Sequence, residues 1–88
     1  MTESSAAAVF DDDYRKAAVD LLGAIAYGEL SAFERLAEDT RLAPTIEDKM
    51  AIGGMAAAEF GQLQKLCTRI TELGADPGDA MRAFQEGF

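Results

Sequence analysis

Two glutamates and one glutamine interrupt apolar helical faces in this sequence. Glu29 lies four residues after one large apolar residue and four before another, and Glu59 repeats that arrangement. Gln62 follows Glu59 by three residues, close to one helical turn. Because residues three or four apart share a helical face, all three polar side chains are predicted to point inward. Carboxylate and amide oxygens placed in this way can ligate a metal ion or share protons in a buried hydrogen-bond network.

The segment between the two glutamates sets their relative height. With the turn centred on Ala43, Glu29 lies fourteen residues before it and Glu59 sixteen after it. At about 1.5 Å of rise per residue, an antiparallel helix pair brings the two carboxylates within about 3 Å of the same height. A buried carboxylate pair is costly, and burial and repulsion raise the pKa of such groups unless the charge is compensated. A metal ion can compensate the charge. The alternatives without metal are a shared proton, a hydrogen-bond network with Tyr27 and Gln62, or water between the helices.

Apolar periodicity predicts the first of the helices that carry these residues. Apolar side chains recur mostly at helical spacing from Tyr14 to Leu36, which predicts a helix over about 12–40. The acidic run at 11–13 suits the start of that helix, where unpaired amide groups favour negative charge. Residues 1–10 lack sustained periodicity and are predicted to form a flexible lead-in to the domain at 11–88.

A turn and a second helix follow. Pro44 lacks an amide donor and disfavours helical geometry before it, which predicts a hairpin turn. Thr45, with an acid three residues later, matches a capping box and predicts a second helix over about 46–73. Asp76 followed by Pro77 is a second helix-start signal, so a short third helix is expected from about residue 77.

The chain is short and acidic, which limits what it can bind. Its 88 residues include sixteen acids and eight bases, for a net charge of −8, and this argues against direct nucleic-acid binding. There is no His, which excludes Ser-His-Asp and Cys-His nucleophiles and requires any metal site to be rich in oxygen. Cys67 lies in the apolar pattern and is expected to be a reduced, buried thiol. The N-terminal residues match neither a secretory signal nor a membrane span, so a cytoplasmic protein is expected.

The predicted helices make an all-α fold, and the short chain length indicates that this fold needs a partner. Two helices in an 88-residue chain cannot remove enough apolar surface from water to offset the loss of chain entropy. A long antiparallel helical hairpin completed by a second helix pair, with a homodimer as the simplest case, is therefore expected. Asp12 with Lys16, and Arg69 with Glu72, have the three- or four-residue spacing of charged pairs on a solvated helix face.

Two stretches, LLGAIAYGELSAFERLAEDTRLAPT and MAAAEFGQLQKLCTRITELGADP, resemble a known family. They are similar to the first helix pair of actinobacterial ferritin-like proteins related to the tRNA 2-methylthio-isopentenyladenosine hydroxylases, over most of residues 14–85. The resemblance implies half of a ferritin-like four-helix bundle, in which Glu29 and Glu59 match iron ligands and dioxygen-dependent hydroxylation is the activity of characterised relatives. The family has His three residues after the second Glu, where this chain has Gln62, and the second helix pair is absent.

Two functions are compatible with these residues. In the first, two copies form a ferritin-like bundle with a di-iron type centre built from Glu29, Glu59 and Gln62, and Tyr27 is a nearby hydrogen-bond donor. In the second, the chain is a non-catalytic dimerisation or interaction module, and its polar layer sets the pairing register instead of binding metal. No catalytic residue is assigned, and the missing His and helix pair leave enzymatic activity open.

Overall fold

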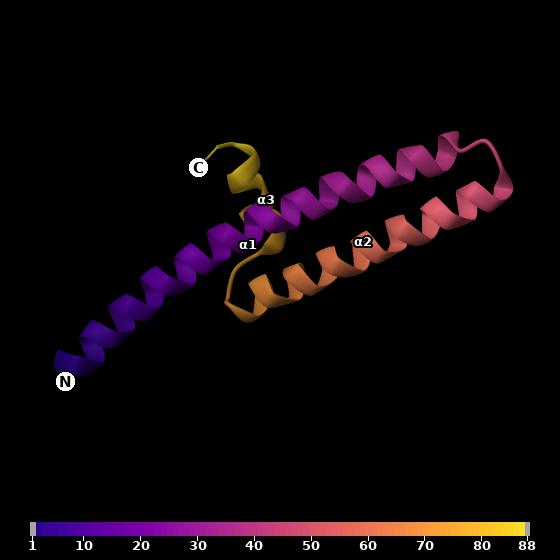
Figure 1. Cartoon of the computed structure of the whole chain (residues 1–88). Helices are drawn as coiled ribbons and strands as arrows, with labels where there is room; N and C mark the ends of the chain where they lie inside the picture. Colours follow the sequence, from indigo (N-terminus) through magenta and orange to yellow (C-terminus); the bar gives the residue numbers. More distant parts are fainter. Residues whose placement is uncertain (1, 88) are drawn as a thin grey trace.

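The computed structural model describes the backbone of residues 2–87 and the side chains of residues 11–87, and it is all-helical as predicted. The helices are α1 (Thr2–Leu42), α2 (Ile46–Glu72) and α3 (Pro77–Gln85). Figure 1 shows α1 and α2 side by side and antiparallel, joined by a tight turn, while α3 crosses α1 near the middle of its length. The predicted hairpin and short third helix are both present.

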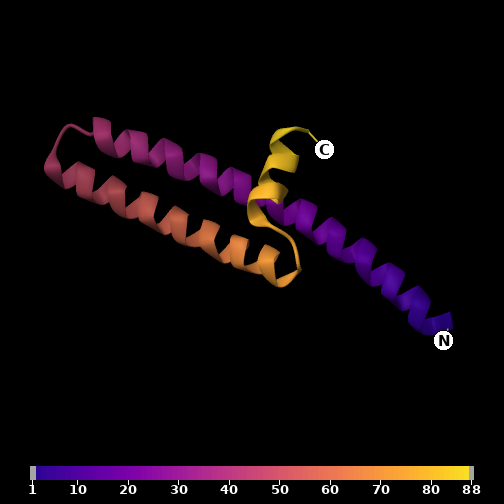
Figure 2. The same cartoon turned by 180° about the vertical axis from the view of Figure 1, so that it is seen from behind.

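The first helix starts earlier than its apolar pattern predicts. Helix α1 begins at Thr2, so most of the predicted lead-in at 1–10 is helical, and the acidic run at 11–13 lies inside the helix instead of at its start. Alanines in this segment have the highest helix propensity, and extending an existing helix costs little once its packed part is formed. As Figures 1 and 2 show, this part of α1 projects beyond the end of α2.

N-terminal capping side chains start α2 and α3 where the sequence predicts them. The Thr45 hydroxyl oxygen accepts a hydrogen bond from the Asp48 amide at 3.0 Å, which starts α2. The Asp76 carboxylate accepts one from the Asp79 amide at 2.9 Å, with proline at the first position of α3. Between these helices Gly74 adopts a φ of +88°, a left-handed conformation that favours glycine at a helix C-terminus.

The core is small and lies where all three helices meet. Its buried members are Ala26 of α1, Leu63 and Ile70 of α2, and Ala80 of α3. Partly buried apolar side chains surround it, namely Val19, Leu22, Leu30, Leu66, Cys67, Ala75 and Met81. Several large apolar residues remain exposed instead, including Leu21 at 61% and Met55 at 56%. The single chain therefore leaves substantial apolar surface in contact with water.

Helix α3 covers one side of α1 only. A Cβ atom at Gly23 would lie 2.6 Å from the Ala80 carbonyl oxygen, so only glycine permits this close crossing. One turn later, the Tyr27 ring packs against Phe84 with ring centroids 5.6 Å apart. Figure 2, seen from behind, shows the same crossing.

The opposite side of the hairpin is uncovered. Ile25 precedes the buried contact residue Ala26, whereas Tyr27 follows it, and at about 100° per residue the two point to opposite sides of the hairpin. In α2, Met55 and Gln62 precede the buried residues Ala56 and Leu63 in the same way. Because the helices face each other and run antiparallel, the positions before the contact residues lie on one side. We call this side the open face, made of Tyr14, Leu21, Ile25, Met55 and Gln62.

Candidate metal centre

The structure brings Glu29 of α1 and Glu59 of α2 together, as the sequence predicts. A hydrogen bond between the two carboxyl groups raises the pKa of Glu29 above its ordinary value, and partial burial and the negative charge of Glu59 raise it further. Both side chains are half-buried at the border between the helix contact and the open face. The two carboxyl groups therefore lie next to each other, as the predicted height match requires.

One oxygen of this pair has no protein partner. Glu59 Oε2 is buried, and among the described residues nothing donates a hydrogen bond to it. A buried polar atom without a partner costs about 1 to 3 kcal/mol. A carboxylate oxygen in this condition is suited to a cation, because it accepts without needing to donate. The chemistry of this donor set thus fits a divalent metal.

Gln62 and Tyr27 lie in different surroundings. Gln62 is exposed on the open face, one turn after Glu59, where a second helix pair would cover it. Tyr27 packs against α3 through Phe84, away from the carboxylates. Two residues before Glu29 correspond to about 200° of helical rotation, so in the single chain Tyr27 and Glu29 point in different directions. The support of the glutamates by Tyr27 stays a prediction.

The described residues of one chain do not complete a metal site. In the described part of the molecule, no group of three or more His, Cys, Asp or Glu side chains is arranged to hold a metal ion. Glu29 and Glu59 give two carboxylates, and Gln62 adds an amide oxygen. Cys67, which was predicted to be buried, is half-buried, and burial raises the pKa of its thiol. A metal site at Glu29 and Glu59 would need further ligands from outside the described chain.

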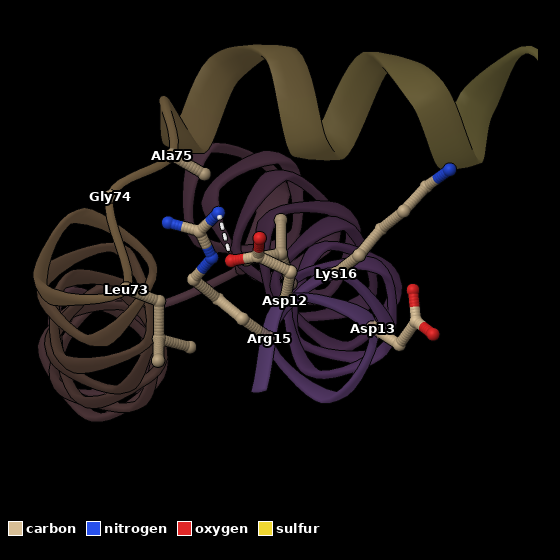
Figure 3. Close-up of a pocket in the computed structure, with 8 residues that line it drawn as sticks. Asp12, Asp13, Arg15, Lys16, Leu73, Gly74 and Ala75 are labelled. Carbon is tan, nitrogen blue, oxygen red and sulfur yellow. Dashed lines mark hydrogen bonds and ion pairs between the residues drawn. The ribbon is translucent and has the colours of Figure 1, made fainter. Parts of the chain in front are cut away.

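A separate cavity of about 420 Å³ lies where α1 passes the end of α2, and no local sequence signal indicates it. Figure 3 shows Asp12, Arg15 and Lys16 of α1 around it, with Gly74 on the opposite wall. Asp12 pairs with Arg15 at 3.2 Å and not with Lys16, while Arg69 pairs with Glu72 at 3.4 Å as predicted. The mixed charges and open walls of this cavity give it the character of a solvated surface.

Replacing Glu29 with glutamine should remove a pH dependence of stability in the metal-free protein. The pKa of Glu29 in the folded protein lies above the ordinary value of 4.5, so the folded state binds this proton more tightly than the unfolded chain. The resulting stabilisation is complete below pH 4.5 and is lost as pH rises through the folded pKa. Glutamine stays neutral throughout. Near pH 7 the Glu29→Gln variant should unfold at a higher urea concentration than the native protein, and near pH 4 the two should converge.

The control for this prediction is Glu34→Gln, which removes an exposed carboxylate five residues later. It should leave the difference in urea midpoint between pH 4 and pH 7 as in the native protein. A Glu29→Gln variant that is less stable than the native protein at pH 7, with chelator present, would contradict the raised pKa of Glu29.

None of the three described helices combines the length and apolar character that a membrane span requires. Comparison with curated proteins finds no match. At the level of protein families, residues 12–88 match the ferritin-like domain of actinomycetes. This match includes Glu29, Glu59 and Gln62 and nearly all of the hairpin with α3. The chain therefore belongs to the ferritin-like domain family of actinomycetes.

Proposed function

We propose that two copies of this chain pair through their open faces and hold two divalent metal ions between Glu29 and Glu59 of each copy, with ferrous iron as the ion. The observation that carries this proposal is the contact between the two glutamates, in which the buried Glu59 Oε2 has no protein partner. A second copy would double the ligand set to four carboxylates. Their four negative charges match two divalent cations, which removes the cost of burying the carboxylates.

The uncovered apolar residues support pairing through this side. Leu21, Ile25 and Met55 are 61%, 43% and 56% exposed, and they flank the glutamates along both helices. Four-helix bundles bury such residues between facing helices and place metal ligands in the same layer. A four-helix bundle formed from two hairpins would therefore bury the apolar side chains and complete the site in one step.

Hydroxylase-like oxidoreductase chemistry belongs to the same proposal. Two ferrous ions, when bound, supply electrons for the reduction of dioxygen, and a hydroxylation would draw further electrons from a separate donor. The chain's own residues hold the metal through Glu29 and Glu59 and exclude water through the apolar residues of the open face. Family membership and the paired carboxylates support this reading.

Anaerobic titration with ferrous iron tests the proposal. The native chain should bind about one ion per copy and sediment as a dimer. Glu59→Gln should weaken binding at least tenfold, equivalent to about 1.4 kcal/mol or more, because it removes a charged ligand. Glu34→Gln, at an exposed carboxylate five residues after Glu29, should bind iron like the native protein. Equal iron binding by all three proteins would show that the two glutamates are not the ligands.

The second candidate function is a non-catalytic dimerisation module. The observation that favours it is the exposed Gln62 at the position where the resembling family has a metal-ligating His. In this case the Glu29 and Glu59 pair sets the register between two copies as a polar layer, and no metal is needed. A well-folded dimer that binds no ferrous iron in the same titration would establish this alternative.

A further inference from the structure

The open face carries a regularly spaced row of side chains along α2. Asp48 lies seven residues before Met55, Gln62 lies seven after it, and Arg69 follows at the same spacing. Because seven residues are close to two helical turns, all four side chains lie on the same side of α2. Asp48 and Arg69 are both exposed. The row therefore has an acid at the end near the turn, a base at the far end and uncharged side chains between them.

The charges of this row lie at nearly equal distances from Glu59. Asp48 precedes Glu59 by eleven residues and Arg69 follows it by ten, so at about 1.5 Å of rise per residue both lie about 15 to 17 Å from it, in opposite directions. Asp39 of α1 is exposed and lies close to four helical turns after Ile25, on the open face and near the height of Asp48. Each copy thus presents two acids near its turn and Arg69 toward its other end.

Two arrangements bring the glutamates of two copies into one layer. If both turns lie at the same end, α1 of each copy faces α2 of the other, and Asp39 of one copy lies opposite Asp48 of the other. If the turns lie at opposite ends, α2 faces α2 in the reverse direction, and Asp48 lies opposite Arg69 of the other copy. Like charges across a contact repel and opposite charges attract, so the charges of the open face favour the second arrangement.

We infer that two copies pair with their turns at opposite ends, so that Asp48 of each copy meets Arg69 of the other. This inference rests on the proposed function for the pairing through the open face, and it adds the direction of the second copy and the charged contacts that set it. Within one chain Arg69 pairs with Glu72 at 3.4 Å, and both side chains are exposed. A guanidinium group has five N–H donors, so Arg69 can bind a second carboxylate without giving up the first.

The test is a double-mutant cycle on the dimer dissociation constant, measured by sedimentation equilibrium with ferrous iron under anaerobic conditions and at low ionic strength. Asp48→Arg and Arg69→Asp each place like charges at two symmetric contacts, so each should raise the dissociation constant about tenfold, equivalent to about 1.4 kcal/mol. The double variant restores opposite charges and should return to within about threefold of the native value. Asp48 and Arg69 are about 32 Å apart along α2, so this coupling can only come from contact between copies.

Glu47→Arg is the matched control, because Glu47 is an exposed acid in the same first turn of α2 and points about 100° away from Asp48. Combined with Arg69→Asp, it should give additive changes. Additive changes for Asp48→Arg with Arg69→Asp as well would overturn the inference and leave the pairing of copies in place. A tighter dimer for Asp39→Arg alone would also overturn it, because that result places both turns at the same end. A native chain that stays monomeric would instead refute the proposed function, and this inference with it.

Discussion

Replacing Ile70 with alanine should lower the free energy of unfolding by about 2 to 5 kcal/mol, the range for large-to-small changes in a packed core. Ile70 has a relative exposure of 0% and is the largest fully buried side chain in the described part of the molecule. It belongs to the buried cluster that includes residues of all three helices. Truncation would leave a cavity at the point where the helices meet, and a small core has few other contacts to compensate.

Urea unfolding followed by circular dichroism measures this effect, at protein concentrations that keep the association state constant. Met50→Ala is the matched control, because Met50 is 73% exposed in the same helix and its truncation should change stability by less than about 0.5 kcal/mol. A loss for Ile70→Ala no larger than for Met50→Ala would mean that the three-helix cluster does not hold the chain together.

Placing lysine at Ile25 should break the association between copies. Ile25 is 43% exposed in the single chain and lies on the open face, where the proposed partner would cover it. Burying an unpaired ammonium group in an apolar contact costs several kcal/mol, so the dimer dissociation constant should rise at least about a hundredfold, equivalent to about 2.7 kcal/mol. Ferrous iron binding should fall with it, since one chain supplies only two carboxylates.

Ile46→Lys separates this prediction from a general effect of added charge. Ile46 is 71% exposed and begins α2, away from the open face. Sedimentation velocity should show a dimer for Ile46→Lys and a monomer for Ile25→Lys at the same concentration. The reverse outcome would assign the contact between copies to another surface of the hairpin.

Local sequence signals predict a large part of this molecule. The apolar spacing predicts the helices, Pro44 and Thr45 predict the turn and the start of α2, and Asp76 with Pro77 predicts α3. Each of these signals acts over one or two helical turns, so no distant contact is needed to interpret it. The meeting of Glu29 and Glu59 is also predictable, because nearly equal distances from a tight turn bring two residues to nearly equal heights in an antiparallel pair.

Other features depend on contacts between segments that are far apart in the sequence. Helix α3 crosses α1 at Gly23, because only glycine lets the Ala80 carbonyl approach so closely, and no local pattern specifies that pairing. This crossing directs Tyr27 to Phe84 instead of to the glutamates.

The start of α1 and the orientation of its faces also lie beyond what the local signals determine. The apolar pattern places the start of α1 near residue 12, but the helix runs from Thr2, because helix propensity can extend a helix beyond its packed face. Apolar spacing identifies residues that share a face, but the direction of that face is decided by which helix packs against it. Here α3 covers one side of α1 and leaves Leu21 and Ile25 exposed on the other.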